Sequence, residues 1–203
     1  MTGCAGAVLH RPAIRATEGR RQPSRKPMYP LLRLGIELAL AARAPRLALD
    51  DVHISHHTCW PWDIDPWMEL NNGRTLTLYD LGRVPLATRT GLVDTARANR
   101  WGLAVAGTSI RYRRRVRAFD RIAMRSAFVG RDTRFLYVAQ AMYHGGEAVS
   151  SALIRSAVTS ADGIVPTDRV MAAMGVPGWD RPLPAWIEAW TEAEAKRPWP
   201  PEI

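Results

Sequence analysis

Residues Trp60–Arg83 read WPWDIDPWMELNNGRTLTLYDLGR and carry the densest chemistry of the chain. Asp63 and Asp65 stand two residues apart among tryptophans and prolines, and Glu69 follows them. An apolar segment of helical character comes next. Carboxylates that lead into a helix N-terminus favour acyl-transfer chemistry, because the helix end supplies free N–H groups beside the acids. We therefore interpret the rest of the chain as the scaffold that surrounds this stretch.

The apolar segment predicts a helix over residues 75–90, apolar on most sides as a buried helix would be. Asn71 or Asn72 is a suitable N-cap. Pro85 should bend this helix or mark its end. Residues 91–100 then form a loop or a short second helix.

The second half of the chain reads as β-structure. Runs rich in Val, Ile, Phe, Tyr and Thr alternate with short polar or glycine breaks, and His144–Glu147 is a hairpin signal. The breaks are short enough for successive strands to be antiparallel neighbours. The predicted strands are 51–59, 104–117, 121–131, 133–144 and 148–159. The sequence thus predicts an α+β fold, with a sheet wrapped over one apolar helix.

At 203 residues the chain suits one domain with appended segments. Helical spacing of apolar residues predicts short amphipathic helices at 30–43, 167–174 and 184–196. The first could lie on a membrane surface, although packing within its own protein is the favoured interpretation. The predicted division is 1–27 (disordered basic extension), 28–49 (amphipathic helix), 50–162 (main domain) and 163–203 (helices and tail).

The net charge of +9 is concentrated at one end. Residues 1–27 contain six basic residues and one acidic residue, which weakens any argument for a nucleic-acid-binding fold. An organellar transit peptide is the less favoured explanation of this leader. No apolar run is long enough to span a bilayer, so we expect a cytoplasmic protein without stable membrane insertion.

Cysteines and histidines provide little evidence for a metal site. Cys4 and Cys59 are the only cysteines, which fits a reducing compartment. His53 and His57 would share a sheet face at a wide separation, with no fitting further ligands. We expect no metal, and we interpret these histidines as surface or interface residues.

Asp65 is the strongest catalytic candidate on the residues alone. Its apolar neighbours should desolvate it partly and make it a better base or nucleophile. The backbone N–H groups of Asn72 and Gly73 would then hold the oxyanion at the helix N-terminus. The alternative is that Asp63, Asp65 and Asn71 are only loop and cap residues.

Basic residues surround Tyr112 in the segment RYRRRVR. A cluster of guanidinium groups suits phosphate, whereas a charged sheet edge that discourages strand pairing is the alternative. The arginines concerned are Arg111, Arg113, Arg114, Arg115 and Arg117.

These residues, in this order, resemble the hotdog-fold thioesterases related to 4-hydroxybenzoyl-CoA thioesterase, over roughly residues 50–160. Asp63-Ile64-Asp65-Pro66 matches the D-x-D-P catalytic turn of that family, in which the second Asp acts on the thioester. Asn71, Asn72, Gly73, Arg74 and Leu76 continue a pattern that also resembles the acyl-carrier-protein thioesterases of plants. Gly107–Ile122 is similar to the strand, basic turn and strand beside the family's CoA groove.

Three positions differ from the family pattern. Glu69 replaces a histidine, Thr75 replaces a tyrosine, and Trp67 replaces an asparagine of the plant-type enzymes. The Asn/His part of the plant mechanism therefore cannot operate here. Glu69 either takes part in catalysis or caps the helix.

The resemblance implies a hotdog fold, a homodimer or homotetramer, and a thioester hydrolase that needs no cofactor, with coenzyme A arriving as part of the substrate. A non-hydrolytic acyl-thioester binder is the alternative, and acyl-carrier protein is the alternative thioester partner. The predicted catalytic residues are Asp65, Glu69, Asn72 and Gly73. The predicted substrate contacts are Asp63, Trp67, Asn71, Arg74, Tyr79, Arg111, Arg113, Arg114 and Arg115.

Overall fold

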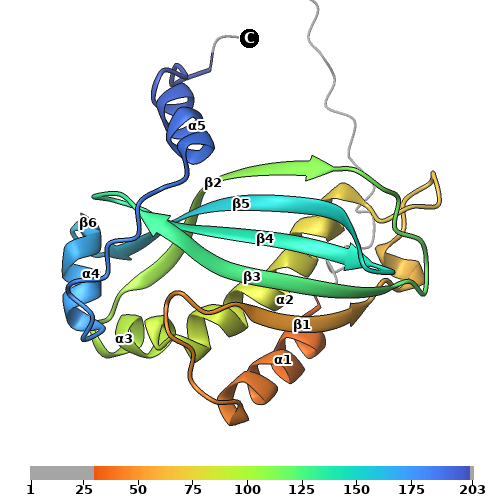
Figure 1. The fold of residues 1–203 in the computed structure, drawn as a ribbon, viewed down its shortest axis with the longest axis horizontal. Helices are drawn as coiled ribbons and strands as arrows, with labels where there is room; N and C mark the ends of the chain where they lie inside the picture. Colours follow the sequence, from red (N-terminus) through yellow and green to blue (C-terminus); the bar gives the residue numbers. More distant parts are fainter. Residues whose placement is uncertain (1–29, 202–203) are drawn as a thin grey trace, which may run out of the picture.

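The structure, a computed structural model, describes residues 30–201, and in it an antiparallel sheet curls over one long helix (Figure 1). The predicted extension 1–27 lies outside the described residues. The strands are β1 (His53–Thr58), β2 (Gly102–Tyr112), β3 (Arg121–Arg131), β4 (Leu136–His144), β5 (Glu147–Ser160) and β6 (Gly163–Ile164). The helices are α1 (Leu31–Arg43), the 3-10 turn η1 (Pro61–Asp63), α2 (Asn72–Arg89), α3 (Leu92–Ala98), α4 (Thr167–Ala173) and α5 (Ala185–Ala195).

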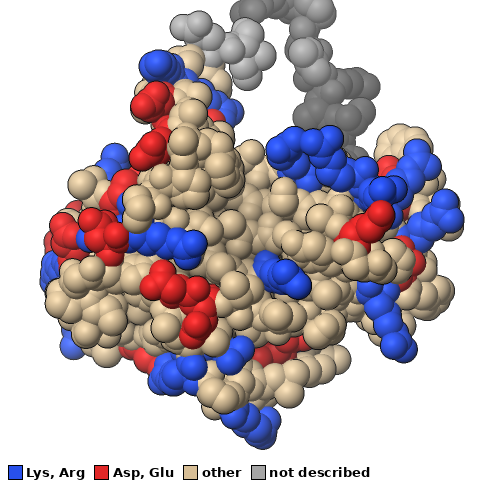
Figure 2. All heavy atoms as spheres, in the orientation of Figure 1, with Lys and Arg blue, Asp and Glu red and all other residues tan. Residues whose placement is uncertain are grey.

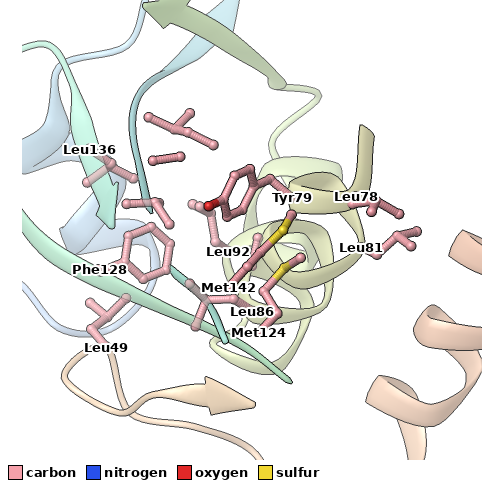
Figure 3. Packing of buried hydrophobic residues seen from close by; sticks show 14 of the residues in the cluster. Leu49, Leu78, Tyr79, Leu81, Leu86, Leu92, Met124, Phe128, Leu136 and Met142 are labelled. Atoms are coloured by element: carbon pink, nitrogen blue, oxygen red, sulfur yellow. The ribbon is translucent and has the colours of Figure 1, made fainter. Parts of the chain in front are cut away.

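Helix α2 is the centre of the molecule. It begins at Asn72, three residues before the predicted start, and it continues past Pro85 to Arg89. Its buried residues pack against the concave face of the sheet, where Met124, Phe128 and Met142 meet them (Figure 3). The helix is buried because apolar residues occur on several of its sides, as the sequence indicated. Those side chains include Leu78, Tyr79, Leu81 and Leu86.

The order of the sheet is β1-β3-β4-β5-β2, with β6 paired to β5. The expectation that all successive strands are neighbours is therefore wrong for β2 and β3. Strand β2 pairs with β5, while β3 pairs with β1 and β4. The predicted strand 104–117 also ends early, at Tyr112, because residues 113–120 cross from one part of the sheet to another.

Strand β2 forms one edge of this sheet and differs from the other long strands in its exposure. None of its residues is buried, and Leu103, Val105 and Tyr112 are exposed large side chains. Strands β3 and β4, by contrast, alternate buried and less buried residues. An 11-residue edge strand with apolar side chains is a surface onto which another strand can add.

Helix α1 confirms the predicted helix at 30–43 and packs against α2. The histidines of β1 differ from the prediction that they lie at the surface or at an interface. His53 and His57 are buried, so neither is a surface histidine, whereas His56 between them is exposed. Burial lowers the pKa of His53 and of His57 to about 4, with further lowering from Arg89 and Arg33 respectively.

The C-terminal part forms the two predicted helices, α4 and α5. Arg131 of β3 holds α4 through Thr167 and Asp168. Ile187 of α5 is buried against Tyr137 and Leu153 on the convex side of the sheet. Within residues 30–201, no helix combines the length and the apolar character that crossing a bilayer requires.

Candidate active site at the N-terminus of the central helix

The loop between β1 and α2 folds back on itself as a small hairpin. The Asn71 N–H donates to Asp63 O at 2.9 Å, Ile64 bridges to Leu70, and the Asp65 N–H donates to Glu69 O at 2.9 Å. Asp65 and Glu69 therefore face each other on the last rung, before a tip made by residues 66–68. This pairing places Asp65 and Glu69 opposite each other in the backbone, directly before the helix.

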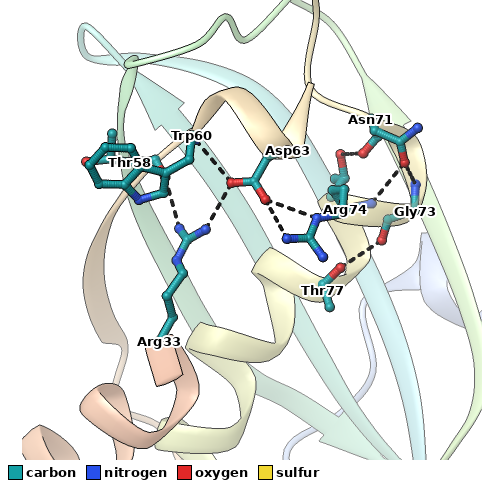
Figure 4. A network of polar contacts seen from close by, with 9 residues as sticks. Arg33, Thr58, Trp60, Asp63, Asn71, Gly73, Arg74 and Thr77 are labelled. Atoms are coloured by element: carbon teal, nitrogen blue, oxygen red, sulfur yellow. Dashed lines mark hydrogen bonds and ion pairs between the residues drawn. The ribbon is translucent and has the colours of Figure 1, made fainter. Parts of the chain in front are cut away.

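Asp63 anchors this loop. Its carboxylate is fully buried and accepts from Arg33 of α1 at 2.9 Å and from Arg74 of α2 at 2.8 and 3.0 Å (Figure 4). The Trp60 N–H also donates to it, at 3.1 Å. The predicted substrate contacts Asp63 and Arg74 are thus engaged with each other, and they tie the loop to both helices.

Asp65 is partly buried, and one oxygen of its carboxylate is held by the backbone of its own loop. Its Oδ1 accepts from the N–H groups of Trp67 at 2.9 Å and Glu69 at 3.3 Å. Among the described residues, its Oδ2 has no hydrogen-bond partner. The expected apolar walls around it do not form, because the side chains of Trp62, Trp67 and Met68 are exposed to solvent.

A cavity of about 330 Å³ opens at the N-terminus of α2. Its wall contains one carboxylate, Glu69, and does not include Asp65. The loop, the helix and the sheet all contribute to this wall, so only the folded chain assembles it. The lining residues are Glu69, Leu70, Asn72, Thr75, Tyr112, Arg113, Arg114, Arg115, Val116 and Ser150.

The helix end confirms Asn71 as the N-cap. Its Oδ1 accepts from the N–H groups of Gly73 at 2.9 Å and Arg74 at 3.2 Å. The predicted oxyanion donor Gly73 is therefore engaged by the cap. The N–H of Asn72 has no acceptor in the described part of the chain, and Asn72 lines the cavity. Of the two predicted donors, Asn72 is the one available to a ligand.

The inner wall of the cavity is polar, and sequence reasoning missed it. Thr75, Tyr112 and Ser150 line it, and they come from α2, β2 and β5. Tyr79 lies behind this wall, fully buried, with its hydroxyl 2.8 Å from Ser150 Oγ. Burial raises the pKa of Tyr79 to about 12 and also raises the pKa of Tyr112. No local pattern marked Ser150, because its place depends on the pairing of β5 with β2.

Arginines line the mouth of the cavity, as the basic segment suggested. Figure 2 shows basic side chains gathered at the right-hand end of this face, where β2 leads into the turn before β3. Arg115 Nε lies 3.1 Å from Glu69 Oε2, and Arg114 Nε lies 2.8 Å from Glu147 Oε2. Arg113 has no ion-pair partner in residues 30–201. Arg111 does not line the cavity, although it was predicted with the others.

Glu69 does not cap α2, since Asn71 has that role, so the helix-capping alternative for Glu69 is wrong. Its carboxylate instead pairs with Arg115 across the cavity wall. Trp67 is exposed at the loop tip and borders a second, shallow hollow with Arg115 and Arg117. In residues 30–201, no cluster of His, Cys, Asp and Glu side chains could hold a metal ion.

Several solved structures that resemble this chain in fold are thioesterases by name. YbaW, a probable thioesterase from Escherichia coli, superposes with a TM-score of 0.56 at 16% identity, over 60% of this chain and 98% of its own. The DHNA-CoA thioesterase of Staphylococcus aureus gives 0.54 at 12% identity, over 71% and 91%. Together with the helix-wrapping sheet, these similarities confirm the predicted α+β hotdog fold.

Curated relatives match this chain over shorter segments. Protein THEM6 of Danio rerio is 32% identical over 92 residues, which are 45% of this chain and 46% of that protein. Protein THEM6 of Xenopus laevis is 32% identical over 80 residues, or 39% of each. The chain thus matches less than half the length of these relatives.

A protein-family model covers most of the chain. The model of the thioesterase-like superfamily matches residues 59–202, which include the loop, α2, the basic turn and the sheet apart from β1. The chain belongs to the thioesterase-like superfamily.

Proposed function

We propose that this protein is a cytoplasmic acyl-CoA thioesterase, which hydrolyses an acyl thioester to the free acid and coenzyme A. One observation supports this above the others. The cavity is lined by the Glu69 carboxylate, by Asn72 with its free N–H at the N-terminus of α2, and by three arginines of the basic turn. The chain that forms it belongs to the thioesterase-like superfamily.

The helix end suits the carbonyl of a thioester. Attack by water or by a carboxylate turns the carbonyl oxygen into an oxyanion, which needs hydrogen-bond donors and positive potential. The N–H of Asn72 and the positive end of the α2 dipole supply both beside the cavity. When water attacks, departure of the coenzyme A thiolate gives the free acid. When a carboxylate attacks, the thiolate leaves first and water then hydrolyses the acyl-enzyme anhydride.

Two carboxylates compete for the role of base or nucleophile. The family pattern assigns Asp65, and its unengaged Oδ2, with Oδ1 held by two N–H groups, supports that assignment. Glu69 lines the cavity, but its carboxylate is already engaged in an ion pair with Arg115. We propose Asp65 as base or nucleophile and Glu69 as the auxiliary acid on the cavity wall.

The arginines at the mouth suit the phosphates of coenzyme A. Arg113, Arg114 and Arg115 line the cavity and also an open hollow beside it, which extends to Arg117. Guanidinium groups bind phosphate through paired N–H donors. We propose that the acyl group enters the cavity while the phosphates contact this turn. The proposed reaction uses no metal or bound cofactor.

We further propose that the active protein is at least a homodimer joined through β2. The exposed edge of β2 supports this, since pairing with a second β2 would satisfy its free backbone groups and cover Leu103 and Val105. Tyr112 ends β2 and lines the cavity, so the joined edge would adjoin the site.

The test is thiol release from acyl-CoAs of graded chain length and with aryl groups, using the purified chain. Asp65→Asn should lower kcat by about 10²-fold or more, the usual contribution of a base. Glu69→Gln should lower it less, because the Glu69 carboxylate is already engaged by Arg115. Asp162→Asn, at an exposed turn, is the matched control and should leave the rate unchanged.

Each other outcome has a clear meaning. Full activity of Asp65→Asn with an inactive Glu69→Gln would transfer the role of base to Glu69. Saturable binding of acyl-CoA without thiol release by the unmodified chain would reject hydrolysis in favour of a non-hydrolytic binder. The replacement of the family histidine by Glu69, tied to Arg115, is the observation that favours this second function.

A further inference from the structure

Helix α1 buries two charged side chains beside the apolar Leu34 and Ala41 on its inner face, and leaves large apolar side chains on its outer face. Its charged residues Arg33 and Glu37 face the protein, where Arg33 binds Asp63 and the Thr58 carbonyl, each at 2.9 Å. Glu37 Oε1 lies 3.5 Å from His57 Nδ1, and both side chains are largely buried. Surface helices of globular proteins place charges outward and apolar residues inward.

The outer face of α1 is apolar. Leu32, Ile36 and Leu40 recur every four residues and form one stripe, with exposed fractions of 79, 51 and 57%. Leu31 adjoins the stripe and is 70% exposed. Contiguous apolar surface of this kind marks a contact with a partner or a membrane. The polar anchors on the inner face fix this orientation, so the stripe cannot turn inward without breaking them.

Charge identifies what covers the stripe. Arg20, Arg21, Arg25 and Lys26 directly precede α1 in the sequence. Parallel pairing with a second copy of α1 would bring two such basic segments together, which is electrostatically unfavourable. An anionic bilayer attracts them, at about 1 kcal/mol per basic residue near the surface. An apolar stripe and an adjacent basic segment are the two signals that together give lasting membrane attachment.

Aromatic residues lie beside the first turn of α1. Trp60 stacks on Trp62 with ring centroids 5.3 Å apart, and Phe119 meets Trp60 edge-on at 6.2 Å. The Trp60 N–H and Arg33 bind the same Asp63 oxygen, so this cluster adjoins α1 (Figure 4). Trp62 and Phe119 are exposed. Tryptophan side chains favour the membrane–water interface, where an apolar ring and a polar N–H are both satisfied.

We propose that this protein binds the surface of anionic membranes through α1, with Leu31, Leu32, Ile36 and Leu40 in the interfacial layer and the aromatic cluster beside them. The helix lies on the bilayer and does not cross it. This proposal is independent of the proposed hydrolysis, because it uses none of the cavity residues.

The test is co-sedimentation of the full chain with vesicles. The chain should bind vesicles of phosphatidylcholine mixed with phosphatidylglycerol much more than vesicles of phosphatidylcholine alone, and added salt should weaken the binding. Ile36→Gln/Leu40→Gln keeps good helix formers at exposed positions and should weaken binding about tenfold or more. Trp186→Gln, on the exposed face of α5, is the matched control and should bind as the unmodified chain does.

Three results would overturn the proposal. The first is failure of the unmodified chain to bind the anionic vesicles. The second is equal binding by the double variant, with circular dichroism showing both proteins folded. The third is a smaller molar mass of the double variant in light scattering without any vesicle binding by the unmodified chain, since α1 would then cover a second copy.

Discussion

At the scale of single residues, two aspartates of the same loop have opposite environments. Asp63 is buried and bound by two arginines, whereas Asp65 stays partly exposed and holds the tip of its own loop. The sequence places them two residues apart and does not distinguish their surroundings. The difference arises because α1 and α2 both bring an arginine to Asp63, and neither reaches Asp65.

The buried pair makes a first prediction about stability. Asp63→Asn removes the counter-charge of Arg33 and Arg74, and breaking a buried ion pair from one side costs about 3–5 kcal/mol. We expect the free energy of unfolding in urea to fall by about 3 kcal/mol, because both arginines keep some access to water. The exposed Asp162→Asn should change it by less than about 0.5 kcal/mol. Equal stability of the two variants would show that Asp63 does not anchor the loop.

At the scale of elements, α2 shows how packing overrides local preference. Pro85 cannot donate a hydrogen bond and disfavours a helix interior, yet α2 continues to Arg89. Pro85 and the residues after it are buried against the sheet and α3, which compensates for the lost bond. Gly82 marks the place where α2 approaches the sheet most closely. A Cβ there would lie 2.6 Å from Met124 Sδ and from Ser126 Oγ.

Two glycine-to-alanine changes separate propensity from packing. Gly35→Ala on α1 has no atom within 4 Å of the added Cβ and should stabilise the protein by up to about 1 kcal/mol through helix propensity. Gly82→Ala gains the same propensity but overpacks the core, so we expect a net loss of about 1–2 kcal/mol. Thermal unfolding of both variants measures the difference. A stabilising Gly82→Ala would mean that α2 does not lie this close to β3.

At the scale of the whole molecule, the sheet ends in two edge strands, β1 and β2, which differ in burial. Strand β1 lies beside the loop that leads to α2 and has buried residues on its inner face. Strand β2 has none and leads directly into the residues that line the cavity. The proposed dimer would therefore complete the sheet and stiffen the mouth of the site together.

The proposed dimer predicts that a charge on the edge of β2 separates the two chains. Val105→Lys places a charge on the edge of β2, which discourages strand pairing. We expect the molar mass in light scattering to fall to that of one chain, with a loss of thiol release, because Tyr112 follows on the same strand. Val176→Lys, an exposed valine outside the sheet, is the control and should remain assembled and active. A monomeric unmodified chain with full activity would contradict the dimer.

The sequence by itself determined the central helix, an N-cap at Asn71 or Asn72, most strand positions and the nearness of Asp65, Glu69 and the helix start. These features are local, since periodicity, capping and turn residues act over a few positions. Only the tertiary structure decided that β2 pairs with β5, that Ser150 and Tyr112 join the cavity, and that Glu69 binds Arg115. It also decided that α1 turns Arg33 and Glu37 inward. Each of these depends on contacts between segments far apart in the chain, and no local pattern encodes which distant segments meet.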